Sequence, residues 1–362
     1  MRSALKNYLG MLAIAIGFVL VIGAIGVRID RAQVYESPDG IEATPALIGN
    51  TPNGLVDAPW LMQHVAEVDY IFDLADLGVY EVGHIPGAVH VWWQDAMALH
   101  PWEYSRPDRI SAPSSSDPVF GRLNLHVPQN ARIVLYDSNQ SERASWMLWV
   151  MRINGYTDVH VLDGGLPAWI GAGGELSTDS TDSRDHELVT EQIWDESQLI
   201  EEAELLAKLD DPNLMLIDTR STEQLQDTVN ETIPVGHIPG AINIPTAEVM
   251  RPDGTFKPPA ELHRGFESIG ITQDADIVVY SLYPLHSGQM WLALHLAGFE
   301  EAVIFADGFY GWGLNTDLPI ATEALPATPV VATPVVTPDL SPTATPAEST
   351  PDDEGPTDLT GD

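Results

Sequence analysis

One six-residue segment, G-H-I-P-G-A, occurs twice in this chain, beginning at Gly83 and again at Gly236. Each copy follows an apolar run that ends in aspartate, at Asp73 and at Asp218. An identical match of this length in matching surroundings indicates that the chain holds two copies of one structural unit. The length of 362 residues is sufficient for two domains of ordinary size.

A longer pattern of apolar and polar residues is also repeated within each copy. Residues 277–280 (I-V-V-Y) form a short β-rich run, and a polar loop follows from Ser281 to Gly288. An amphipathic helical pattern then continues to about Leu296, and residues 302–305 form a second apolar run. The first copy has the same order between Ile133 and Trp169. This order predicts strand, loop, helix and strand in a parallel sheet, with the loop at the sheet edge where open α/β sheets bind ligands.

The composition excludes several classes of function. Asp and Glu together number 53 against 16 Lys and Arg, so the formal net charge is −37. A field of this sign repels phosphate backbones, and we expect no nucleic-acid partner. The chain contains no cysteine, which excludes disulfides, thiolate metal sites and thiol nucleophiles. The repeated histidines, His84 and His237, are expected to brace their turns, and the sequence predicts no metal or cofactor site.

The N-terminal residues include an uncharged run from Tyr8 to Val27. As a helix this run would be roughly 30 Å long, which is the thickness of a bilayer core. Arg2 and Lys6 precede the run and Arg28 and Arg31 follow it, so the basic residues give little indication of orientation. We expect an uncleaved signal anchor, with a cleaved signal peptide as the alternative, because no clear small-x-small exit follows the run.

Changes in composition divide the chain into six segments. They are a transmembrane anchor at 1–31, a linker at 32–54, a first domain at 55–175, a connector at 176–195, a second domain at 196–320 and a tail at 321–362. The second domain is expected to begin with an acidic helix at residues 197–209. The tail is rich in Thr, Pro and acidic residues, which predicts an extended, disordered segment. Such tails are similar to extracellular stalks, so we expect both domains to be extracytoplasmic.

The two G-H-I-P-G-A segments resemble the rhodanese family of sulfurtransferases, as do the units that close in D-G-G-L-P-A-W and D-G-F-Y-G-W. The resemblance covers roughly Leu55 to Leu318, which is nearly all of the expected folded chain. It implies two tandem α/β domains, each a doubly wound, mainly parallel sheet with helices on both faces. It also implies that the first copy is inactive and that the second carries the catalytic loop, as is usual in two-domain members.

Active members of that family carry a cysteine directly after the apolar strand, where it accepts sulfane sulfur as a persulfide. Here the corresponding positions hold Ser281 in the second copy and Asp137 in the first. A serine hydroxyl has a far higher pKa than a thiol and cannot form the persulfide. The second loop also contains no Lys or Arg, and its Pro284 lacks an N–H group. In the first loop, Asp137 and Glu142 are expected near the mouth, where they would repel an anion despite Arg143. We therefore expect no sulfur transfer by the usual route.

The leading hypothesis is a membrane-anchored, non-catalytic binding or scaffolding module with a shallow pocket over the 281–288 loop. Its partner would be another envelope protein or a small ligand. The candidate residues around the two loops are Ser281, His286, Ser287, Gly288, Arg220 and Arg143. Arg220 matches the family's D-x-R pattern and is expected to supply positive potential near the second loop. The alternative is an enzyme: a sulfurtransferase-family protein with residual or altered activity, or a hydrolase in which His286 activates Ser281, although no orienting acid is evident in the sequence.

Overall fold

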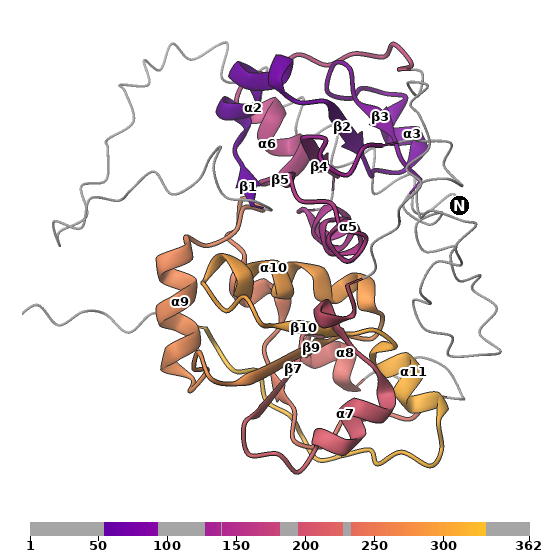
Figure 1. Cartoon of the computed structure of the whole chain (residues 1–362), viewed down its shortest axis with the longest axis vertical. Helices are drawn as coiled ribbons and strands as arrows, with labels where there is room; N and C mark the ends of the chain where they lie inside the picture. The colour runs from indigo at the N-terminus through magenta and orange to yellow at the C-terminus, as the bar shows by residue number, and fades with distance from the viewer. Residues whose placement is uncertain (1–53, 93–126, 139, 182–194, 227–232, 331–362) are drawn as a thin grey trace, which may run out of the picture. The chain divides into compact units, whose positions relative to one another are not determined.

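The structure is a computed structural model that describes residues 54–92, 127–138, 140–181, 195–226 and 233–330 (Figure 1). The run from Tyr8 to Val27, expected to be a membrane anchor, lies outside these residues, as does the linker up to Asn53. Among the helices that the structure describes, none is long and apolar enough to cross a membrane.

The first domain is built on a five-stranded sheet in the order β1-β5-β4-β2-β3, and every pair of neighbouring strands is parallel. Its elements are β1 (Leu55–Val56), α2 (Ala58–His64), η1 (Val65–Glu67), β2 (Tyr70–Asp73), α3 (Leu77–Tyr80), β3 (Val89–His90), β4 (Ile133–Tyr136), α5 (Glu142–Ile153), β5 (Val159–Leu162) and α6 (Gly165–Gly171).

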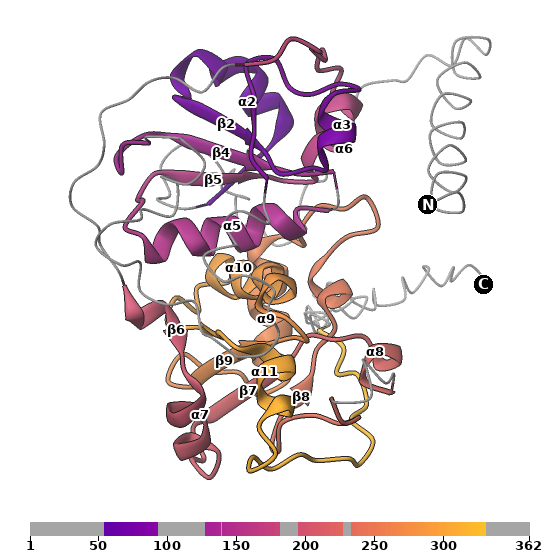
Figure 2. The same ribbon diagram turned by 90° about the vertical axis from the view of Figure 1, so that its right-hand side faces the viewer.

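The second domain repeats this topology with a parallel sheet in the order β6-β10-β9-β7-β8 (Figure 2). Its elements are η2 (Glu196–Gln198), β6 (Leu199–Ile200), α7 (Glu202–Lys208), β7 (Leu214–Asp218), α8 (Thr222–Gln226), β8 (Ile242–Asn243), η3 (Thr246–Val249), α9 (Pro259–Ser268), β9 (Asp276–Tyr280), η4 (Pro284–Ser287), α10 (Gly288–Leu296), β10 (Val303–Phe305) and α11 (Gly308–Leu314). The predicted fold of two α/β domains with parallel sheets is confirmed.

The start of the second domain differs from the single acidic helix expected at residues 197–209. Leu199 and Ile200 instead form the edge strand β6, which pairs with Ile304 and Phe305 of β10, and a short helix, α7, follows. The acidic stretch has good helical propensity, but pairing with the sheet removes two apolar side chains from water and overrides that preference.

Each sheet is covered by helices on both faces because side chains alternate along its strands. In the first domain, Leu135 of β4 belongs to the same apolar cluster as Trp146 of α5. The neighbouring Val134 belongs to a second cluster, with Leu61 of α2 and Trp169 of α6. The helices α5 and α2 accordingly lie on opposite sides of the sheet (Figure 2). Fully apolar strands buried on both faces are the pattern expected of a doubly wound sheet.

The helices α5 and α10 pack against each other between the two sheets, and both domains belong to one compact unit of the chain. The expected amphipathic pattern for α10 is therefore replaced by burial on all sides, and its residues from Gly288 to Leu294 are all buried. A Cβ atom at Gly288 would lie 2.5 Å from the backbone nitrogen of Trp146, so only glycine allows this approach. This packing places the 281–288 loop against the first domain.

The chain after α11 returns along the second domain instead of leaving it. Ala321 pairs with His237 in an antiparallel bridge, and Ala327 pairs with Asn243 in a parallel one. Val330 is buried, with 1% of its surface exposed. Ordered contacts thus extend beyond the boundary expected at residue 320, because this segment completes the edge of the sheet at β8.

Candidate functional site

Both G-H-I-P-G-A turns are held by matching contacts in the two domains. The phenol oxygen of Tyr136 accepts a hydrogen bond from the amide of Ile85 at 3.1 Å, and Tyr280 accepts one from Ile238 at 3.2 Å. Burial raises the pKa of both tyrosines. The ring nitrogens of His84 lie 2.9 and 3.0 Å from main-chain oxygens, so this histidine braces its turn. Among the described residues, no group of three or more metal-ligating side chains is present.

The loop after β4 is filled by the side chain of Asp137, which is fully buried. Its Oδ1 accepts a hydrogen bond from the amide of Ser141, and its Oδ2 accepts one from the amide of Ala144, both at 3.0 Å. These amides belong to the first turn of α5, where unpaired N–H groups and the helix dipole favour an anion. Asp137 was expected near the mouth of the loop, but it is instead buried, with its carboxylate bonded to the amides of the loop.

The backbone of this first loop is unusual. Gln140 and Ser141 have φ values of 56° and 64° and are the non-glycine residues in the described part of the chain with positive φ. A left-handed conformation at such residues turns successive amides to one side of the loop and costs conformational energy. The loop therefore retains an anion-binding shape, and the carboxylate of Asp137 is the group that satisfies it.

The second domain covers this first loop from outside. Asp163 accepts a hydrogen bond at Oδ1 from the amide of Phe256 at 2.9 Å, and the side-chain amide of Gln289 donates to the main-chain oxygen of Gln140 at 2.7 Å. A Cβ atom at Gly164 would lie 3.1 Å from a methyl group of Thr255. Burial at this contact raises the pKa of Asp163 to about 6.

The loop after β9 places Ser281 at the position that corresponds to Asp137. Only 3% of Ser281 is exposed, and its main-chain oxygen accepts a hydrogen bond from Phe309 at 2.8 Å, as that of Asp137 does from Leu166 at 2.9 Å. No hydrogen bond joins Ser281 to His286 in this part of the structure. The two residues of the hypothetical serine–histidine pair therefore share a loop without forming the pair.

His286 instead faces the first domain. Its Nε2 lies 3.6 Å from Oε1 of Glu142, the first residue of α5, and 35% of its side chain is exposed. The sequence did not connect these residues, because only the packing of α5 against η4 brings the first copy to the second loop. Glu142, expected at the mouth of the first loop, is thus a neighbour of the second.

The rest of the second loop packs closely. Ser287 is fully buried, and its hydroxyl has no hydrogen-bond partner among the described residues. Leu285 and Gly288 are also buried, whereas Tyr283, Pro284 and His286 remain half-buried. The face of the loop toward α5 is filled, so the surface available to a ligand consists of these half-buried side chains.

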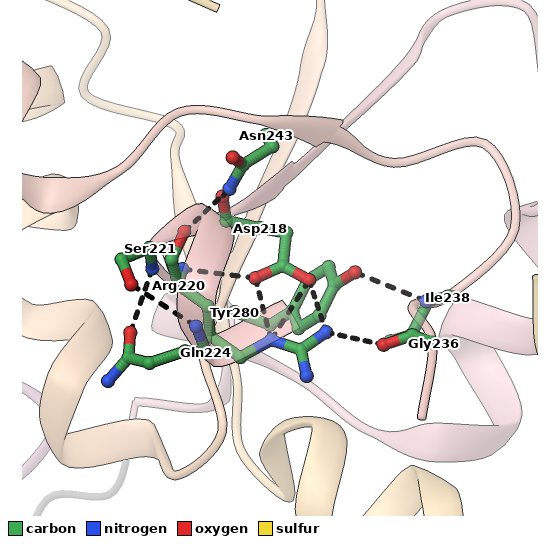
Figure 3. Close-up of polar contacts among 8 residues, drawn as sticks. All are labelled: Asp218, Arg220, Ser221, Gln224, Gly236, Ile238, Asn243 and Tyr280. Atoms are coloured by element: carbon green, nitrogen blue, oxygen red, sulfur yellow. Dashed lines mark hydrogen bonds and ion pairs between the residues drawn. The ribbon is translucent and has the colours of Figure 1, made fainter. Parts of the chain in front are cut away.

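Arg220 is buried beside Asp218 and Gly236 (Figure 3). Its Nη2 donates to Oδ2 of Asp218 at 2.6 Å and to the main-chain oxygen of Gly236 at 2.8 Å, and its Nε donates to Oδ1 of Asp218 at 3.0 Å. The guanidinium also lies 4.2 Å from the ring centre of Phe309. Only 2% of Arg220 is exposed. Its guanidinium therefore interacts with Asp218 and the G-H-I-P-G-A turn and does not face a ligand in solvent.

The first domain lacks this arginine, so its buried aspartate has different partners. Asp73 corresponds to Asp218, and Ala75 stands where Arg220 would be. The Oδ1 of Asp73 accepts a hydrogen bond from the amide of Ala75 at 2.8 Å, and burial raises the pKa of this carboxyl group. Arg143, the remaining candidate cation, reaches the β2–α3 connection, where its Nη1 lies 3.1 Å from both the main-chain oxygen of Leu74 and Oδ1 of Asp76.

Two parallel-sheet domains that each present a loop after the central strand define a tandem rhodanese architecture. The rhodanese-like domain family matches residues 57–172 and 201–315, so the chain belongs to this family. The chain is 30% identical over 290 residues to the sulfur carrier protein TtuD of Thermus thermophilus, an alignment that covers 75% of this chain and 97% of that protein. It is also 31% identical over 247 residues to a probable 3-mercaptopyruvate sulfurtransferase of Pseudomonas aeruginosa, covering 67% and 86% of the two chains.

A solved structure gives the same fold. The wild-type structure of EanB aligns with a TM-score of 0.65 at 20% sequence identity, covering 76% of this chain and 69% of that one. The predicted membership of the rhodanese family is therefore confirmed, in a chain with no cysteine.

Proposed function

We propose that this chain is a rhodanese-like module that does not transfer sulfur and that binds a partner protein or a small ligand at its second loop. The observation that carries the proposal is the state of the two positions after the central strands. Ser281 is buried at one, and Asp137 is buried at the other with its carboxylate bonded to the loop amides. Neither position offers a group that could hold sulfane sulfur.

The charges around the second loop also support the absence of sulfur transfer. Anionic sulfur donors require cations or unpaired amides near the acceptor atom. Arg220 is paired with Asp218, and the chain enters η4 at Pro284, which has no N–H group. The Nε2 of His286 lies 3.6 Å from the carboxylate of Glu142. A negative group at this position disfavours an anionic substrate.

The surface of the second loop suits a binding role. Tyr283 and Tyr310 have ring centres 5.2 Å apart, and the ring of His286 lies 6.0 Å from that of Tyr283. All three side chains are half-buried, as is Pro284. Tyrosine is enriched at protein interfaces because a rigid ring buries much area with little loss of conformational entropy. We infer that this aromatic surface (Tyr283, Pro284, His286 and Tyr310) contacts the partner.

The same proposal places the protein at a membrane. The uncharged run from Tyr8 to Val27 is long enough to span a bilayer, and the Thr- and Pro-rich tail suits an extracytoplasmic location. The two folded domains would then be held near the membrane surface, where the second loop meets another envelope protein or a ligand.

Binding is tested with the full-length chain as bait for envelope proteins, beside a variant carrying Tyr283→Ala and His286→Ala. A control variant carries Val82→Ala, since Val82 is 74% exposed in the first domain. We expect a specific partner to be retained by the wild type and by the control and to be lost with the double variant. Equal recovery by all three proteins, or recovery by none, would count against the second loop as the binding surface.

The hydrolase alternative is tested with a fluorophosphonate probe, which labels activated serines. We expect no labelling of Ser281, because it is buried and has no bond to His286. Labelling that disappears in Ser281→Ala and in His286→Ala would support serine chemistry instead.

A further inference from the structure

Residues 327–330, which follow the second domain, lie along the edge of its sheet at β8. Ala327 pairs with Asn243 in a parallel bridge, and the amide of Thr328 donates to the main-chain oxygen of Asn243 at 2.6 Å. β8 is the last strand of its sheet, so its outer side has main-chain groups available for a further strand. The segment binds as an added strand, which is a common way in which sheets recognise extended peptides.

Val330 anchors this segment. Ala327 and Pro329 are exposed, whereas Val330 is 1% exposed and joins the apolar cluster that contains Leu262 and Phe266. Its main-chain groups are also held by charged side chains, since its amide lies 3.2 Å from Oε2 of Glu248 and its oxygen lies 3.2 Å from Nζ of Lys257. We call this site the Val330 groove, formed by the β8 edge, Glu248, Lys257 and Gly265.

Gly265 shows how closely the groove fits its occupant. It lies within α9, where glycine is less favourable than alanine. A Cβ atom at Gly265 would lie 2.5 Å from Cγ1 of Val330, and its three nearest neighbours would all be atoms of Val330. The absent side chain therefore makes room for this valine.

The sequence of the docked residues 327–330, A-T-P-V, occurs again at residues 332–335, and a valine follows each copy. The second copy would present the same side chains to the β8 edge, with Val335 in the place of Val330. We propose that the Val330 groove recognises this motif and that residues 332–336 occupy it in exchange with residues 327–331, which gives the tail two docking registers.

The chain connection permits both registers. The bridge between Ala321 and His237 fixes the start of the segment. The connection from Ala321 to the motif grows from six residues (321 to 327) to eleven (321 to 332) when the second copy docks. Loop-closure entropy then favours the first copy by only roughly 2.5-fold, since the cost rises with the logarithm of loop length. Each register leaves the other copy of the motif outside the groove.

The exchange is tested in the full-length chain with Val330→Asp, Val335→Asp and the double variant, each measured by urea denaturation. If the two copies share the groove at a ratio of about 2.5 to 1, losing the first lowers the folding constant about 3.5-fold and losing the second about 1.4-fold. The double variant is expected to lose far more than the product of these factors, because it leaves the groove without an occupant. A Thr337→Asp variant adds the same charge outside both copies and should not differ from wild type.

Several results would overturn the proposal. If Val330→Asp lowers the stability as much as the double variant does, or prevents folding, the second copy does not dock. A double variant as stable as wild type would show that docking contributes nothing. A rescue of Val330→Asp that weakens on dilution and accompanies dimers would mean that the second copy binds another chain instead. Gly265→Ala should destabilise the wild type but not the double variant, and equal losses in both would place its effect outside the groove.

Discussion

The carboxylate of Asp137 permits a direct test of the view that the first domain supplies its own anion. It accepts two hydrogen bonds from the amides of Ser141 and Ala144 at the start of α5. Because hydrogen bonds to a charged group contribute about 1.5–3 kcal/mol each, and water replaces part of the loss, we expect Asp137→Ala to reduce the free energy of unfolding by about 2–4 kcal/mol. Asp137→Asn retains one hydrogen-bond acceptor without the charge. Its free energy of unfolding should lie between those of the wild type and Asp137→Ala.

The vacated position should then accept an anion from solution. Urea denaturation with sodium sulfate or thiosulfate, against sodium chloride at equal ionic strength, measures this effect. At 100 times its Kd, a bound anion would restore about 2.7 kcal/mol to Asp137→Ala. Sulfate also stabilises proteins in general, so the informative quantity is the difference between the variant and the wild type. Equal stabilisation of both proteins would refute the view that Asp137 fills an anion site.

Three further predictions concern buried ionisable side chains. The pKa of Asp163 is raised from 3.8 to about 6, so Asp163→Asn should stabilise the chain at pH 8 by up to about 3 kcal/mol. This gain should fade as the pH falls from 6 to 3.8, which urea midpoints at pH 8 and pH 4 measure. Burial and then the charge of Arg152 lower the pKa of His295 from 6.5 to about 4, so the wild type should lose up to about 3 kcal/mol as the pH falls from 6.5 to 4; His295→Gln should show a shallower loss, and parallel pH profiles would contradict this reasoning. Arg220→Met should cost about 3–5 kcal/mol, because it leaves the carboxylate of Asp218 buried without a partner, and adding Asp218→Asn should recover part of the loss in a double-mutant cycle.

The strand–loop–helix units are the part of the fold that the sequence predicts best. The apolar run at residues 277–280 is β9 with one more residue at its start, and the helix expected to end at about Leu296 does end there. Gly298, with a φ of 92°, follows that helix as the expected stop signal. These signals are local, so they can be read without knowledge of tertiary contacts.

Features that depend on distant contacts could not be predicted in the same way. The propensity of residues 197–209 favours a helix, yet β6 forms there because β10 offers a partner strand. The acidic, Thr- and Pro-rich composition after residue 320 predicts disorder, yet Val330 is buried because a groove with a matching glycine accepts it. Composition describes the average behaviour of a segment and gives no information about a single anchoring residue.

Among the charged residues near the loops, some contacts can be predicted from the local sequence and others depend on tertiary packing. The inward position of Asp137 could not be read as a helix cap, because the N-cap of α5 is Ser141 and Asp137 reaches the amides of Ser141 and Ala144 from the start of the loop. The pairing of Arg220 with Asp218, two residues earlier, was within reach of the sequence. The contact between His286 and Glu142 was not, because it exists only through the packing of α5 against η4.

The measurement that tests the central claim most directly is sulfur transfer from thiosulfate to cyanide by the full-length chain, with Ser281→Cys and Ser281→Ala beside it. We predict that the wild type and Ser281→Ala both match the rate without protein. Activity that appears only in Ser281→Cys would agree with the account and show that the second loop has lost only its nucleophile. Turnover by the wild type that saturates with thiosulfate and disappears in Ser281→Ala would contradict it.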